Sequence, residues 1–152
     1  MSRPLVIGIG NIERGDDGVG RQVARLLKHM LGEKAEILEQ DGEAGAILAH
    51  IEKAQTAYLV DACMSSAPPG TVHRIDAAEG ELPLSSSDLS THGFGLASAI
   101  ELARSLGQLP AKTIVFAIEA DSFEPGAPLS KDVSDAAVIV ADRIRSELEG
   151  TG

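Results

Sequence analysis

The glycine-rich stretch GIGNIERGDDGVG, residues 8–20, carries two consecutive acids, Asp16 and Asp17. Two of its glycines have the spacing of the phosphate loop GxxxxGK[ST], but the two aspartates stand where that loop needs a lysine and a hydroxyl. The dinucleotide fingerprint also fails, because Glu13 occupies the position of its third glycine. Paired carboxylates repel a polyphosphate, whereas beside a helix N-terminus they are stabilised by the dipole and can offer oxygen to a cation. We interpret the loop as metal-directed; the alternative is that Asp16 only caps a helix and Asp17 is only a first-turn acid.

Two more side chains are predicted to reach the same place. Asp61 follows the apolar strand 56–60, and the carboxyl ends of parallel strands share the sheet edge at which ligands bind. His92 stands after the longest loop, 76–91, and immediately before a helical pattern. Two carboxylates and one imidazole leave coordination positions open and suit zinc, nickel, manganese or cadmium, so the residues alone do not name the metal. The other histidines are predicted away from this edge: His29, His50 and His73.

Nucleophilic chemistry has weaker support. Cys63 lies two residues after Asp61 and could pair with His92 as a thiolate, but a lone cysteine in an apolar context is typical of a buried packing residue. The serines lack the spacing of a nucleophile elbow, and the zinc peptidase motif HExxH is absent from the sequence. The metal hypothesis is therefore the stronger one.

The elements that must position these residues alternate between short apolar runs and longer helical patterns. This alternation is typical of βαβ units around a mainly parallel sheet. Strands are predicted over residues 4–9, 35–40, 56–60, 71–75 and 112–118, the fourth of them at an edge. Helices are predicted over residues 19–30, 45–53, 93–107 and 133–148.

Composition restricts the possible partners. The 152 residues suit a single domain spanning 1–152, and 43% apolar with only 3% aromatic residues predicts an aliphatic core. A formal charge of −10 argues against nucleic acid and anionic membranes, and favours a metal, a cationic ligand or a basic segment of another protein. One cysteine excludes an internal disulfide, and no apolar stretch approaches the ~20 residues of a membrane span. We expect a soluble, cytoplasmic monomer.

The motifs together carry a resemblance to a known family. GIGNIERGDDGVG, then LVDA at residues 59–62, THGFGL at 91–96 and IEADSFEPGAPLSKDV at 118–133 resemble the maturation endopeptidases of nickel-iron hydrogenases. The resemblance implies a three-layer αβα sandwich of the phosphorylase/hydrolase-like kind, with a twisted, mainly parallel five-stranded sheet and helices on both faces. It also implies one proteolytic cut, which removes a C-terminal extension from the large-subunit precursor of a nickel-iron hydrogenase after nickel insertion.

The same resemblance assigns roles to residues. The family's metal-contacting and catalytic positions fall on Asp17, Asp61 and His92. Asp16 and Asp41 are assigned to substrate binding, Asp16 by shaping the loop and Asp41 by contacting the peptide. The implied metal is the nickel of the precursor, which zinc or cadmium can replace in vitro. A non-catalytic nickel-sensing chaperone that binds the same precursor is the alternative, and a nucleotide-binding domain is a weaker third.

Two departures from the family pattern stand out. Glu43-Ala44 follows Asp41-Gly42 where relatives have Gly-Thr, which questions any substrate contact in that loop. Ala120 replaces a proline after Glu119, which should change local rigidity more than chemistry.

Overall fold

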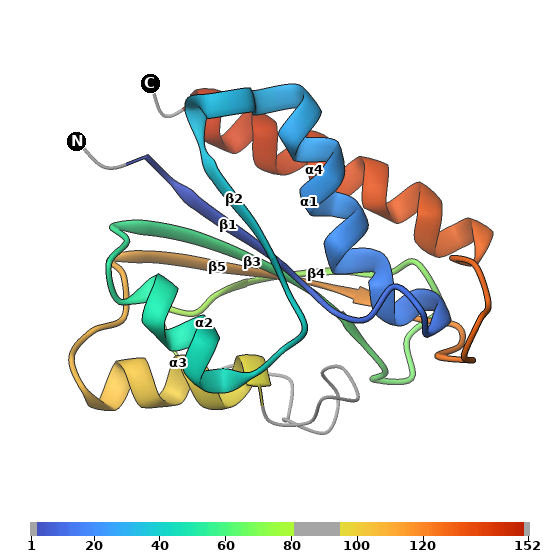
Figure 1. The fold of residues 1–152 in the computed structure, drawn as a ribbon, viewed down its shortest axis with the longest axis horizontal. Helices are drawn as coiled ribbons and strands as arrows, with labels where there is room; N and C mark the ends of the chain where they lie inside the picture. The colour runs from blue at the N-terminus through green and yellow to red at the C-terminus, as the bar shows by residue number, and fades with distance from the viewer. Residues whose placement is uncertain (1–2, 81–94, 151–152) are drawn as a thin grey trace.

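The computed structural model describes residues 3–80 and 95–150. Its centre is a five-stranded sheet with the strand order β2-β1-β3-β5-β4, in which the first four strands are parallel and β4 runs antiparallel to β5 (Figure 1). This confirms the predicted mainly parallel sheet. The strands are β1 Leu5–Ile9, β2 Glu36–Gln40, β3 Thr56–Cys63, β4 Val72–Asp76 and β5 Lys112–Glu119.

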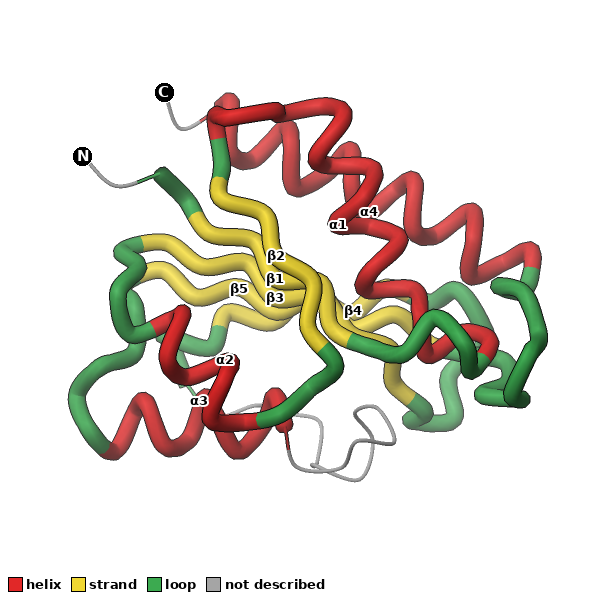
Figure 2. Tube along the Cα trace, in the orientation of Figure 1, coloured by secondary structure: helices red, strands yellow, loops and turns green. Residues whose placement is uncertain are grey.

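Helices cover both faces of the sheet, which confirms the three-layer architecture (Figure 2). Helices α1 Val19–Leu31 and α4 Lys131–Gly150 pack together on one face. Helices α2 Ala44–Ile51 and α3 Gly95–Ser105 cover the other. Two short 3-10 helices flank α1: η1 Gly15–Gly18 and η2 Gly32–Lys34. Within the described residues, no helix is both long enough and apolar enough to span a membrane.

The core is mainly aliphatic, as the composition predicted, with one pair of aromatic rings. Central strands β1, β3 and β5 are buried on both faces, so their sequences are nearly continuous apolar runs. Along β3, Tyr58 and Val60 pack towards α1 and α4, whereas Leu59 and Cys63 pack towards α2 and α3. The ring of Tyr58 stacks on that of Phe116 with a centroid separation of 6.4 Å.

Several element boundaries differ from the predicted ones where they affect the site. Strand β3 continues to Cys63, because its last residues pair with β5 up to Glu119, so Asp61 lies inside the strand rather than after it. Helix α2 ends at Ile51, before the predicted 53. The segment 81–94, which holds most of the predicted long loop together with His92 and the predicted start of the third helix, lies outside the described residues.

Candidate functional site

The loop after β1 is shaped by glycines that let backbones touch. Gly10 has a φ of 146°, and a Cβ on it would overlap the carbonyl oxygen of Asp17. A Cβ on Gly20 would overlap the carbonyl oxygens of Ile9 and Val60. The start of α1 therefore packs directly on the carboxyl ends of β1 and β3, next to Asp61.

Asp17 and Asp61 lie at this same edge of the sheet. Asp17, in η1, is fully buried, and its Oδ2 accepts a hydrogen bond of 3.2 Å from the Asn11 N–H. Asp61 is 1% exposed, and its Oδ1 accepts from the Ala62 N–H at 2.8 Å. Buried carboxylates are costly unless hydrogen bonds or a cation compensate them. The fold thus gathers two of the three predicted metal-contacting residues at one edge, and the third, His92, lies outside the described residues.

Asp16 has a different role from its neighbour. Its carboxylate is 1% exposed and accepts hydrogen bonds from the backbone N–H groups of Asp121, Ser122 and Ser130 at 2.8, 3.2 and 2.7 Å, and from the Ser130 hydroxyl at 2.8 Å. These contacts join the loop after β1 to the segment between β5 and α4. Asp16 therefore fixes the shape of the loop after β1, and its assignment to substrate binding stays a prediction. It does not cap α1, because the N-cap position of that helix is Gly18.

Asp41 lies in the connection between β2 and α2 and is exposed to solvent. The next residue, Gly42, packs so closely on the start of α3 that a Cβ on Gly95 would overlap its carbonyl oxygen. Glu43 caps α2, since its carboxylate accepts from the N–H groups of Gly45 and Ala46, both at 2.8 Å. The departure from the family pattern at Glu43 therefore has a structural use, since this residue caps α2.

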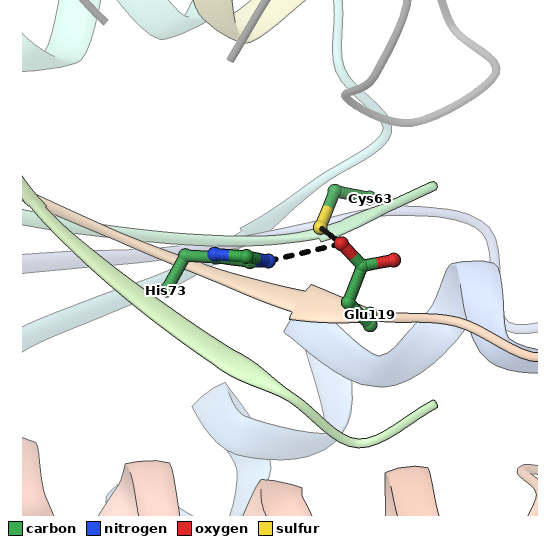
Figure 3. A group of neighbouring side chains, drawn as sticks. All are labelled: Cys63, His73 and Glu119. Carbon is green, nitrogen blue, oxygen red and sulfur yellow. Dashed lines mark hydrogen bonds and ion pairs between the residues drawn. The ribbon is translucent and has the colours of Figure 1, made fainter. Parts of the chain in front are cut away.

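A second group of chemically capable side chains lies at the same edge and was not predicted. Cys63, His73 and Glu119 come from β3, β4 and β5, and one ligand atom from each lies within 4.8 Å of the other two (Figure 3). The Cys63 thiol donates to Glu119 Oε1 at 3.4 Å, and His73 Nε2 is 2.9 Å from the same oxygen. Ser65 donates to Glu119 through its hydroxyl and through its backbone N–H.

The expectation that His73 lies away from the ligand edge was wrong. Strand β4 runs antiparallel, so it begins at the edge where β3 and β5 end, and His73 is its second residue. A signal was available in the sequence: the turn Pro68-Pro69-Gly70 follows β3 so closely that it can only return the chain at the same edge. Cys63 is fully buried, as predicted.

Glu119 is a charged group in this cluster. Its side chain is 1% exposed, and burial by itself favours the neutral form. Hydrogen bonds from Ser65, His73 and Cys63 outweigh this effect and hold the pKa of the Glu119 carboxyl below its ordinary value. A buried anion consequently stands between a thiol and an imidazole.

By its fold and its candidate site, the protein belongs to the class of three-layer α/β sandwiches that place buried acids at the carboxyl ends of parallel strands. Within that class, the model of the family described as HycI, hydrogenase maturation protease, matches residues 21–147. The chain belongs to this family of proteases, which confirms the resemblance seen in the motifs. The matched range contains Asp61 and begins just after the loop that carries Asp16 and Asp17.

Individual relatives agree with the family match. The hydrogenase 2 maturation protease of Escherichia coli K12 is 26% identical over 154 aligned positions, which cover 99% of this chain and 93% of the relative. The hydrogenase expression/formation protein HupD of Thiocapsa roseopersicina is 28% identical over 117 positions and 76% of this chain. The chain spans about half of the length of HupD, 53%.

Solved structures share the fold. The hydrogenase maturating endopeptidase HybD from E. coli superposes with a TM-score of 0.80 at 23% identity, covering 99% of this chain and 94% of HybD. The [NiFe] hydrogenase maturation protease HycI from Thermococcus kodakarensis KOD1 gives a TM-score of 0.75 at 24% identity, with 97% and 93% covered. At these identities the likeness concerns the arrangement of strands and helices.

Proposed function

We propose that this protein is an endopeptidase that removes the C-terminal extension from the large-subunit precursor of a nickel-iron hydrogenase once nickel has been inserted. The observation that carries the proposal is the match of residues 21–147 to the hydrogenase maturation proteases. The two buried aspartates at the carboxyl edge of the sheet supply a chemical reason, since they offer hard oxygen ligands to a cation.

In this proposal the nickel is part of the substrate. Asp17 and Asp61 contact the metal of the precursor, with His92 as the third contact that the motif resemblance assigns. Holding the metal fixes the peptide next to it, so a water molecule can be brought against one particular carbonyl. Hydrolysis adds the water oxygen to that carbonyl carbon and breaks the C–N bond, and the departing amine takes up a proton. The exposed Asp41 contacts the peptide beyond the metal.

The test is a cleavage assay with purified, nickel-loaded precursor, followed by mass spectrometry of the large subunit. We expect Asp17→Asn and Asp61→Asn each to slow cleavage by about 100-fold or more, since changes even beyond the ligands of a metal cost 10–100-fold. Asp135→Asn is the matched control, because this aspartate lies exposed on α4 in a surface ion pair with Lys131. The control should cleave at the normal rate.

Two outcomes would contradict the proposal. If the Asp17→Asn variant cleaved the precursor at the normal rate, Asp17 would have no role in the reaction. An intact C-terminus after incubation with the wild-type protein, combined with nickel-dependent complex formation, would instead indicate the non-catalytic nickel-sensing chaperone.

A further inference from the structure

The cluster of Cys63, His73 and Glu119 brings together three kinds of metal-binding atom. Cys63 lies directly opposite Glu119 in the β3–β5 register, and His73 lies opposite Ala117, two residues before Glu119. Because side chains alternate along strands, all three project from the same face of the sheet. The sulfur, imidazole nitrogen and carboxylate oxygen lie within 4.8 Å of one another (Figure 3).

The separations of these atoms are close to those of a tetrahedral zinc site. With zinc bonded to sulfur at about 2.3 Å and to nitrogen and oxygen at about 2.0–2.2 Å, ligand atoms lie roughly 3.3–3.6 Å apart. The Cys63 Sγ is 3.4 Å from Glu119 Oε1, and His73 Nε2 is 2.9 Å from that oxygen. The second distance must lengthen slightly for an ion to be held between these two atoms.

The exposure of the three side chains and the hydrogen bonds that hold Glu119 fit a metal site that can be filled from solvent. Cys63 and Glu119 are buried, whereas the His73 side chain is 27% exposed and forms the outer wall. Ser65 holds the carboxylate in place: its backbone N–H donates to Glu119 Oε2 at 3.1 Å and to Oε1 at 3.3 Å, and its hydroxyl donates to Oε1, the oxygen that also faces the thiol and the imidazole. Hydrogen bonds of this kind orient ligands in metal sites.

We propose that Cys63, His73 and Glu119 form a binding site for a zinc-class divalent cation, with a water molecule as the fourth ligand. The site is distinct from the Asp17–Asp61 pair, although Asp61 lies two residues before Cys63 on the same face of β3. Its donor set contains sulfur, which favours zinc, cobalt or nickel over magnesium, calcium or manganese. A bound ion ties β3, β4 and β5 together at the edge where the acids lie.

Cobalt titration tests the site directly. A thiolate bound to Co²⁺ gives a charge-transfer absorption band in the near ultraviolet, and Cys63 is the one cysteine of the sequence, so such a band reports on this residue alone. The aspartates of the other candidate site contain no sulfur and cannot produce it. We expect the band to saturate at one cobalt ion per chain and to disappear when zinc is added.

Variants separate the site from adventitious thiol binding. Cys63→Ser should abolish the band, and His73→Gln should weaken cobalt binding by about tenfold or more. Glu119→Gln should have the same effect. Because the His73 side chain is partly exposed, His73→Gln tests the site while leaving the buried carboxylate in place. Asp17→Asn and His50→Gln, the latter an exposed histidine on α2, should leave the titration unchanged.

Each outcome decides the matter, provided that circular dichroism shows a folded protein. Absence of the band in the wild-type protein at a large excess of cobalt would overturn the proposal. Unchanged binding in both His73→Gln and Glu119→Gln would overturn it too, because the thiolate would then bind metal without its partners. These results do not depend on the cleavage assay, so the two proposals can fail separately.

Discussion

Two buried carboxylates at the same sheet edge, Asp16 and Glu119, are surrounded by different kinds of partner. Asp16 accepts mainly from backbone N–H groups, those of Asp121, Ser122 and Ser130. Glu119 accepts from one backbone N–H, and its other partners are a hydroxyl, a thiol and an imidazole. Both are 1% exposed, so burial does not distinguish them.

The difference teaches which buried acids are available for chemistry. A backbone N–H can only donate, and its direction is fixed by the chain, so three of the four donors around Asp16 can neither turn away nor act as acceptors. Hydroxyl, thiol and imidazole groups can exchange donor and acceptor roles or bind a metal. Glu119 therefore has partners that can rearrange around a new ligand, whereas Asp16 has partners that hold a loop.

The largest effect is expected from Asp16→Asn. In either orientation, the new NH₂ group would face a backbone N–H, of Ser130 on one side or of Asp121 on the other. Two donors facing each other in a buried place leave both without an acceptor, so the free energy of unfolding should fall by about 3 kcal/mol. Urea denaturation measures this loss.

The matched control for that change is Asp121→Asn. This aspartate lies in the same segment, but its side chain is exposed and only its backbone N–H contacts Asp16. Its effect should stay within about 0.5 kcal/mol. Equal losses in the two variants would show that the carboxylate of Asp16 does not hold the loop.

A smaller loss is expected from the equivalent change at the other carboxylate, Glu119→Gln. The amide oxygen can keep the bond to the Ser65 N–H, and the NH₂ can donate to the hydroxyl of Ser65 or to the ring of His73. The free energy of unfolding should fall by about 1–2 kcal/mol, clearly less than for Asp16→Asn. Glu124→Gln, an exposed glutamate, is the control. If Glu119→Gln lowered the free energy of unfolding as much as Asp16→Asn, the partners of Glu119 would be no more adaptable than those of Asp16.

The smallest effect is expected at a third carboxylate, Glu147 on α4, which has a cation for a partner. Arg74 donates to both of its oxygens, at 2.8 and 3.0 Å, and the Tyr58 hydroxyl donates at 2.7 Å. Since the Glu147 side chain is 20% exposed, Glu147→Gln should cost only about 1 kcal/mol at neutral pH.

This third effect should depend on pH with a definite sign. The hydrogen bond from Arg74, helped by Tyr58 and by the nearby Arg143, lowers the pKa of the Glu147 carboxyl from its ordinary 4.5. A carboxyl whose pKa is lower in the folded state stabilises that state at pH values above its ordinary pKa. This contribution disappears as the pH falls through the pKa that the carboxyl has in the folded state. The difference between wild type and Glu147→Gln should therefore shrink below about pH 4.5 in denaturation curves. A difference that grows on acidification would contradict the assignment.

Residue patterns were sufficient to predict the mainly parallel sheet and the edge that gathers Asp17 and Asp61, because apolar periodicity reports burial and parallel strands share a carboxyl edge. The helices on both faces were implied by the family resemblance. Periodicity alone could not place His73, since it is the same for a strand in either direction, and the turn at residues 68–70 was the signal that could have placed it. The partners of Asp16 were also beyond prediction, because they are backbone groups of a loop with no periodic pattern. The role of His92 stays a prediction.

The contacts of Asp16 also determine when the candidate site can form. Its partners lie 105 to 114 residues further along the chain, among the most distant pairings that a protein of this size allows. Contacts so far apart in sequence require most of the chain to be ordered before they are made. A chain still emerging from the ribosome can assemble β1 and α1, but it has no anchor for Asp16 until residues 121–130 have been synthesised. The loop that carries Asp17 thus acquires its working shape only in a nearly finished molecule, which keeps a half-folded chain from presenting it.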